Sequence, residues 1–193
     1  MNIIKLNAID STNSYIKKLS NEIAIESYTI VVAEHQTKGR GQLGTSWLSD
    51  KGKNLTFSIL IKFDNFEVQN QFYLSMAVSL GVLASIKKGI SSSLKIKWPN
   101  DILSGNNKVA GILIENILRR NFIKQSVIGI GINVHQKVFP KSIENVTSLK
   151  NISGSDYDMD VLLRDLIKMI KFYVGYIEKK EFKTLKSLYI NSL

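Results

Sequence analysis

The stretch EHQTKGRGQLGTSW, residues 34–47, lies between two apolar runs of the chain. The run YTIVVAE (28–34) leads into it and the run NLTFSILIKF (54–63) follows it, and both have the length and composition typical of buried strands. The loop interleaves three glycines with two cations: Gly39, Gly41, Gly44, Lys38 and Arg40. Glycine lets the backbone approach a ligand closely, and cations beside free amides suit a phosphate or a carboxylate. The loop therefore predicts an anion site, although a mobile surface connection has the same composition.

The composition is that of one globular domain over residues 1–193, because 44% of the residues are hydrophobic and the mean hydropathy is zero. Cysteine is absent, which excludes disulfides and thiolate metal sites. The N-terminal sequence MNIIKLNAIDSTN has no basic start, long apolar core or small-residue cleavage site. We therefore expect a cytoplasmic protein without a secretory signal.

The formal net charge of +10 favours an anionic partner, which could be a nucleotide, a nucleic acid, an acidic protein or a membrane surface. Many of the lysines are scattered along the chain, as they are on a solvated surface. The sequence contains no zinc finger, no RNP-type aromatic motif and no long basic helix. The charge alone therefore does not indicate a nucleic-acid-binding protein.

Hydrophobic periodicity, capping residues and turn residues predict the remaining elements. Before the glycine-rich loop, these are a strand over 1–9 and a helix over 12–19 capped by Asp10 or Ser11. In the middle of the chain they are an apolar helix over 71–89, a turn at 91–93, a strand over 94–98, a type I turn around Pro99 and a hairpin with strands over 102–103 and 108–118. The last part contains a strand over 126–135, an irregular connection over 136–157, an amphipathic helix over 159–178 and a last helix over 182–189.

Polar and charged residues cluster where two of these strands end or begin. Lys97, Asn100 and Asp101 flank Pro99, and a cation and a carboxylate at a strand end form either a surface ion pair or a phosphate-and-metal site. Lys108 begins the returning strand of the hairpin beside small residues, where it either blunts the strand end or faces a ligand.

The strand over 126–135 alternates isoleucines with Gly129 and Gly131, which leaves one of its faces bare before Asn133. Glycine weakens a strand, so two at alternate positions indicate that a neighbouring helix or a bound ligand packs closely there. No nucleophile is paired with a base, since His35 and His135 have no evident triad partner. Cations that hold phosphates and a carboxylate together suit nucleotidyl transfer better than hydrolysis.

Five motifs in this order and spacing resemble those of biotin protein ligases, biotin–[acetyl-CoA-carboxylase] ligases, over most of residues 10–134. They are STN (11–13), HQTKGRGQLGTSW (35–47), KIKWPNDIL (95–103), KVAGILIE (108–115) and VIGIGINV (127–134). The resemblance implies an α+β fold with a mixed, largely antiparallel sheet and helices packed against it, related to class II aminoacyl-tRNA synthetases.

The resemblance also implies an activity in two steps. Biotin, with ATP and Mg²⁺, gives biotinyl-5′-AMP, and a lysine of a biotin carboxyl carrier protein domain then attacks the adenylate. Carrier domains of this kind tend to be acidic, so the basic surface would speed their encounter. Exposed sheet edges make a homodimer a further expectation.

Residue roles follow from the resemblance, motif by motif. Arg40 and Lys108 are the expected catalytic residues, because they would hold the carboxylate and phosphate and stabilise charge at the reacting centre. The residues expected at biotin are Ser11, Thr12, Asn13, Gln36, Arg40, Gly41, Gln42, Lys108, Gly111, Gly129 and Gly131. The residues expected at the nucleotide are Arg40, Trp47, Lys97, Asn100 and Asn133, with Asp101 as the Mg²⁺ ligand.

The sequence departs from the family pattern at three places. Position 42 is glutamine where the family loop often has arginine, so one positive charge that would help to retain the adenylate is missing. We expect no N-terminal helix-turn-helix domain, hence no DNA binding, and no SH3-like C-terminal domain. By the same resemblance, the glycine-rich loop over 34–47 is expected to close over the adenylate and to shield it from water.

The sequence leaves three other hypotheses about function open. A lipoate protein ligase shares the fold and the adenylation chemistry, although the KWPND and GRGxxG runs favour biotin. A non-catalytic nucleic-acid-binding module rests on the charge alone. A scaffold that binds biotin without forming the adenylate rests on Gln42 and on the absent C-terminal domain.

Overall fold

The computed structural model describes residues 2–88, 90 and 93–193, and the chain divides into two compact units. The first unit comprises the chain up to Gln71 together with Ile112–Ile132, and the second comprises Phe72–Gly111 and Asn133–Leu193. Gly89 and most of the turn predicted at 91–93 lie outside the described residues.

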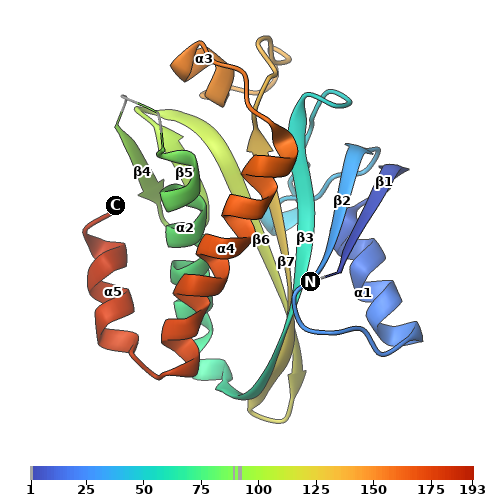
Figure 1. Ribbon diagram of the computed structural model, residues 1–193, viewed down its shortest axis with the longest axis vertical. Helices are drawn as coiled ribbons and strands as arrows, with labels where there is room; N and C mark the ends of the chain where they lie inside the picture. Colours follow the sequence, from blue (N-terminus) through green and yellow to red (C-terminus); the bar gives the residue numbers. More distant parts are fainter. Residues whose placement is uncertain (1, 89, 91–92) are drawn as a thin grey trace. The chain divides into compact units, whose positions relative to one another are not determined.

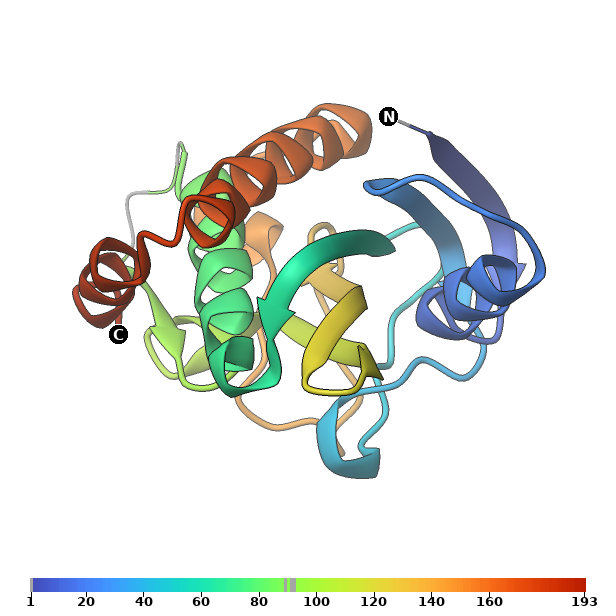
Figure 2. The ribbon, with the colours of Figure 1, turned by 90° about the horizontal axis from the view of Figure 1, so that it is seen from below.

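The first unit contains strands β1 (Ile3–Ile9), β2 (Thr29–Gln36) and β3 (Asn54–Glu67), and most of β7 (Phe122–Asn133). Strand β1 pairs parallel with β2, which pairs antiparallel with β3. Helix α1 (Thr12–Glu22) lies beside β1 and β2 (Figures 1 and 2). Its apolar face packs into a buried cluster with the strands: Ile16, Ile25, Val31, Leu60 and Val127. Two short 3-10 helices, Gln42–Gly44 and Val68–Asn70, complete this unit.

The second unit contains the hairpin of β4 (Leu94–Lys97), β5 (Asp101–Ser104) and the start of β6 (Asn107–Arg119). Gly105 turns the chain between β5 and β6 with a positive φ of 56°, which costs glycine little. Its helices are α2 (Gln71–Ile86), α3 (Leu149–Ser153), α4 (Met159–Glu178) and α5 (Phe182–Ile190). Asp158 caps α4 by accepting from two backbone N–H groups of its first turn.

The strands follow the order β1-β2-β3-β7-β6-β5-β4 in one seven-stranded sheet. One recorded pairing, between β1 and β2, is parallel, whereas those of β2 with β3, β4 with β5 and β5 with β6 are antiparallel. The α+β class with a mixed, largely antiparallel sheet, expected from the sequence, is therefore confirmed. No helix within the described ranges is long and apolar enough to cross a membrane.

Several predicted boundaries need correction. Helix α1 extends to Glu22 rather than Leu19, and β7 begins at Phe122 and ends at Asn133 rather than spanning 126–135. The connection over 136–157, predicted as irregular, contains α3, which is too short to show helical periodicity.

Two details of the predicted elements are visible only in the structure. Phe72 lies on the helix predicted to be apolar, yet its side chain is 52% exposed and pairs with the indole of Trp98, with ring centroids 6.5 Å apart. The turn after β4 is present, and its Trp98–Pro99 peptide bond is cis.

Helices α2 and α4 cross at Gly81, where the backbone of α4 leaves no room for a side chain on α2. A Cβ atom at Gly81 would lie 2.8 Å from Ile170 Cα and 2.9 Å from Ile170 N, both backbone atoms that cannot rotate away. The small residue therefore lets the two backbones approach, and the buried residues around it close the core of this unit.

Gly81→Ala should lower the free energy of unfolding by about 1–3 kcal/mol, because the added methyl group forces the helices apart. Gly175→Ala is the matched control, since a Cβ there meets nothing within 4 Å. It should stabilise α4 by up to about 1 kcal/mol through helix propensity. Urea denaturation of both variants measures the difference, and equal effects would contradict the close crossing.

Candidate functional site

The N-terminus of α1 is held by a side chain from another strand. Ser11 occupies the N-cap position but its side chain makes no capping hydrogen bond, and Asp10 Oδ1 accepts only from the adjacent Ser11 N, at 2.6 Å. Gln36 at the end of β2 instead accepts from Thr12 N at 2.8 Å and from Thr12 Oγ1 at 3.0 Å. Ser11, one of the two predicted residues, is therefore the N-cap, but neither its side chain nor that of Asp10 caps the helix, because a residue 24 positions away fills that role.

A buried polar network continues inward from Thr12. Ser58 Oγ on β3 lies 2.7 Å from Thr12 Oγ1 and 2.6 Å from Asn13 Oδ1, and its single proton can serve one of them at a time. Thr12, Asn13 and Ser58 are each at most 3% exposed. Such a network is costly to leave half satisfied, so it fixes the start of α1 against β2 and β3.

Asn13 connects this network to an acidic residue on β6. Its Nδ2 donates to Glu115 Oε2 at 2.8 Å, and the same oxygen accepts from Arg40 Nη2 at 2.6 Å. Lys17 Nζ lies 3.8 Å from the other oxygen, Glu115 Oε1. The first unit thus brings together Thr12, Asn13, Gln36 and Arg40, four residues that the resemblance implies for biotin, and their role there stays a prediction. Ser58 and Glu115 had not been singled out.

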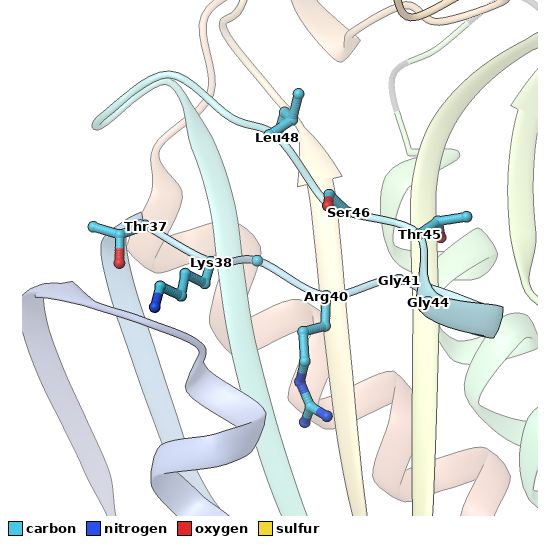
Figure 3. Close-up of a pocket in the computed structure, with 9 residues that line it drawn as sticks. Thr37, Lys38, Arg40, Gly41, Gly44, Thr45, Ser46 and Leu48 are labelled. Atoms are coloured by element: carbon cyan, nitrogen blue, oxygen red, sulfur yellow. The ribbon is translucent and has the colours of Figure 1, made fainter.

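The glycine-rich loop forms a pocket of about 450 Å³ within the first unit (Figure 3). Its lining consists of small, polar and cationic residues together with one leucine: Thr37, Lys38, Gly39, Arg40, Gly41, Gly44, Thr45, Ser46 and Leu48. Two backbone hydrogen bonds shape it, from Trp47 N to Gly39 O (2.9 Å) and from Gly41 N to Thr45 O (2.7 Å). A Cβ at Gly39 would overlap the Trp47 carbonyl, so the turn requires glycine there.

The bare face of β7 is covered by two side chains of the first unit. A Cβ at Gly129 would lie 2.5 Å from Asn13 Oδ1, and one at Gly131 would overlap the Trp47 indole. Of the two alternatives left open by the sequence, close packing by a neighbouring element is therefore present. The predicted roles of Gly129 and Gly131 at biotin, and of Trp47 at the nucleotide, stay predictions.

The second unit holds the other predicted residues. Lys108 Nζ forms an ion pair of 2.7 Å with Asp101 Oδ1, and both side chains are partly buried. Lys97 pairs in register with Asp101 across β4 and β5, and Gly111 faces Asp101 across β5 and β6. The cation that Asp101 holds is thus the hairpin lysine, a partner that the turn sequence did not reveal.

Asn133 anchors the chain around Lys108. Its Nδ2 donates to Thr147 O at 3.0 Å and to Lys108 O at 3.5 Å, while Lys108 N donates to Asn145 O at 2.7 Å. Asn133 is 2% exposed, and its Oδ1 has no hydrogen-bond partner within the part of the chain that is described. The side chain therefore fixes the backbone of Lys108 and leaves one acceptor unused.

Ten of the predicted site residues belong to the first unit and six belong to the second. Those in the first are Ser11, Thr12, Asn13, Gln36, Arg40, Gly41, Gln42, Trp47, Gly129 and Gly131, and those in the second are Lys97, Asn100, Asp101, Lys108, Gly111 and Asn133. One signal could have revealed Glu115, because it is the first acidic residue after Lys108 in the otherwise apolar run KVAGILIE.

Sequence and structure comparisons agree with this arrangement of motifs. Residues 6–133 match the model of the biotin/lipoate A/B protein ligase family. The chain belongs to this family. It is 32% identical over 168 residues to the bifunctional ligase/repressor BirA of Bacillus subtilis, covering 86% of the chain and 51% of that protein. It is also 32% identical over 146 residues to the biotin–[acetyl-CoA-carboxylase] ligase of Mycobacterium tuberculosis, covering 74% of the chain and 52% of that protein.

Solved structures of the family extend the likeness beyond the matched motifs. The biotin protein ligase from Aquifex aeolicus in complex with biotin and ATP superposes with a TM-score of 0.81 at 34% identity, over 96% of this chain and 75% of that one. The biotin/lipoate ligase fold expected from the sequence is thereby confirmed. The chain spans about half the length of the curated relatives it matches.

Thr12→Val tests the buried network, because valine keeps the shape of threonine and removes its hydroxyl. The loss leaves Ser58 and Gln36 short of a partner in a buried setting, and the free energy of unfolding should fall by about 1–3 kcal/mol. Thr12→Ser keeps the hydroxyl and should cost less than about 1.5 kcal/mol. Chemical denaturation compares the two variants, and a serine variant as unstable as the valine variant would rule out the hydrogen bonds as the cause.

Proposed function

We propose that this chain is a biotin protein ligase, which activates biotin with ATP and transfers it to a carrier lysine. The observation that carries the proposal is the likeness to the Aquifex aeolicus ligase, which binds both biotin and ATP, over nearly the whole of this chain. Membership of the family limits the alternatives to biotin and lipoate chemistry.

The proposed reaction has two steps. A carboxylate oxygen of biotin attacks the α-phosphorus of ATP, the bond from that phosphorus to the α,β-bridging oxygen breaks, and pyrophosphate leaves as biotinyl-5′-AMP forms. The Nζ of the carrier lysine then attacks the acyl carbon, the bond from that carbon to the phosphate oxygen breaks, AMP leaves, and the nitrogen loses a proton to solvent. Both steps build negative charge on phosphate oxygens, which fixed cations stabilise.

The network at the start of α1 supports a role in binding the ureido ring of biotin, which offers both donors and an acceptor. Gln36 Oε1 is engaged by Thr12, and the Gln36 amide group makes no other hydrogen bond within the described chain. We propose that the Gln36 Nε2 group donates to the ureido oxygen of biotin, with Ser11 and Thr12 beside it. Asn13, Gly41, Gln42, Gly111, Gly129 and Gly131 complete the proposed biotin set.

Arg40 and Lys108 are the proposed catalytic cations. Arg40 lines the loop pocket and would hold the carboxylate and the α-phosphate, whereas Lys108 would stabilise charge at the reacting centre. Trp47, Lys97, Asn100 and Asn133 are assigned to the nucleotide. The unused, buried Oδ1 of Asn133 suits a donor on the adenine ring.

Magnesium would reach the site on the phosphates of the substrate ATP, which usually supply much of its coordination. Asp101 forms an ion pair with Lys108, and the described ranges contain no group of three or more His, Cys, Asp or Glu side chains that could hold a metal. The role of Asp101 as a magnesium ligand stays a prediction.

A biotin carboxyl carrier domain is the proposed acceptor, and the net charge of +10 would favour an acidic one. Strands β1 and β4 stand at the two edges of the sheet order, so either one could form a homodimer interface. The cytoplasmic location, and the absence of DNA and membrane partners, stay predictions.

Arg40→Ala and Lys108→Ala should each lower kcat/KM for biotin-dependent pyrophosphate release by about 100-fold or more, because each removes charge stabilisation of the transition state. The assay uses ATP, magnesium and biotin, with and without a carrier domain, since a retained adenylate stops the reaction after one turnover. Lys18→Ala is the control, because it removes an exposed lysine that pairs with Glu22 on α1.

Lipoate replaces biotin in a parallel assay. Release that depends on lipoate and not on biotin would transfer the chain to the lipoate branch of the family. Biotin binding without any release would support the inactive scaffold, and salt-sensitive nucleic-acid binding without either would support the nucleic-acid module.

Gln42→Arg restores the charge that the loop lacks and should slow the escape of biotinyl-5′-AMP by roughly threefold to tenfold through attraction to its phosphate. Rapid gel filtration measures the adenylate that stays with the protein. Gln69→Arg adds the same charge at an exposed site of the first unit and should leave retention unchanged. Equal retention in both variants would show that position 42 has no special role.

A further inference from the structure

Glu115 is an acidic residue of the first unit that pairs with two cations, Arg40 and Lys17. Its side chain is 22% exposed and sits on β6, where Asn13 Nδ2 and Arg40 Nη2 both donate to Oε2. Lys17 approaches Oε1 at 3.8 Å. Two cations thus share one carboxylate next to the predicted anion site.

The ion pair leaves most of the arginine available. The recorded contact uses one nitrogen of the guanidinium, and the Arg40 side chain is 43% exposed. Guanidinium groups bind carboxylates and phosphates best through two parallel hydrogen bonds. A bound anion therefore has a geometric advantage over Glu115 at the same arginine.

The two partners differ in their freedom to move. Glu115 is fixed on a strand and held by Asn13, which accepts a hydrogen bond from Ser58 in turn. Arg40 lies on an exposed loop, where backbone hydrogen bonds join Gly39 to Trp47 and Gly41 to Thr45, and its side chain is 43% exposed. If the pair separates, the arginine side chain moves and the carboxylate stays.

We propose that Glu115 is a positioning residue, an internal counter-anion that docks Arg40 and that a bound carboxylate or phosphate displaces. It lowers the affinity of the site for anions relative to neutral ligands, because an anion must outcompete a carboxylate for the arginine, whereas a neutral ligand does not compete for it. The identity of that anion as biotin or its adenylate rests on the proposed function.

The first test measures anion binding without biotin. In a Trp98→Phe background, Trp47 is the remaining tryptophan and directly follows the loop, so its fluorescence reports a pyrophosphate titration. Glu115→Gln keeps an acceptor for Asn13 and removes the charge, and pyrophosphate should bind roughly threefold to tenfold more tightly. Glu22→Gln, which removes a carboxylate paired with Lys18 elsewhere on α1, should change nothing.

Combining Glu115→Gln with Arg40→Ala separates this role from a structural one. If Glu115 acts through Arg40, the gain in anion affinity disappears in the Arg40→Ala background. A gain that persists there, an unchanged or weaker affinity in Glu115→Gln, or no response to pyrophosphate in any variant would each overturn the proposal.

The second test compares biotin with the neutral biotinamide by calorimetry. Glu115→Gln should tighten biotin by roughly threefold to tenfold and leave biotinamide unchanged, whereas equal changes for both ligands would overturn the proposal. Failure of the parent protein to bind either ligand would contradict the proposed function instead, and the pyrophosphate titration would still decide the role of Glu115.

Discussion

The hydrogen bonds from Thr12 to Gln36 are the constraint on which the first unit depends. They cap the N-terminus of α1 with a side chain from the end of β2, which fixes the start of the helix next to the end of that strand. Ser58 and Asn13 extend the same network across β3 and toward β6. Because Thr12, Asn13 and Ser58 are almost fully buried, the network tolerates few other placements of α1.

This constraint shapes the ligand site as well as the fold. Thr12, Asn13 and Gln36 belong to this network and are also residues that the resemblance implies for biotin, so under the proposed function the same side chains would serve the fold and the ligand. The free amide of Gln36 and the open edge of Arg40 are what remain for a ligand once the internal hydrogen bonds are made. In the second unit, the Asn133 side chain fixes the backbone of Lys108 through Nδ2, while its Oδ1 accepts no hydrogen bond within the described residues.

Charge is arranged in the same way in the two units. Arg40 and Lys108 each face a carboxylate of their own unit, Glu115 and Asp101 respectively. Neutralising each cation within its own unit avoids leaving partly buried charges without a partner. Under the proposed function, a substrate anion would replace or join these carboxylates.

Much of the fold and of the candidate site could be predicted from the sequence because it is encoded locally. Helical periodicity placed α4 at its observed bounds, the apolar runs placed β2 and β3, and alternate glycines on β7 indicated a closely packed face. The order and spacing of five short motifs were enough to indicate the family. Only the tertiary structure decided which side chains meet: Gln36 with Thr12 across 24 positions, Glu115 with Arg40 across 75, and Glu115 with Asn13 across 102. Such pairs depend on strand register and helix placement, which a single sequence does not specify, because a shift of one residue would turn each strand's side chains to the opposite face.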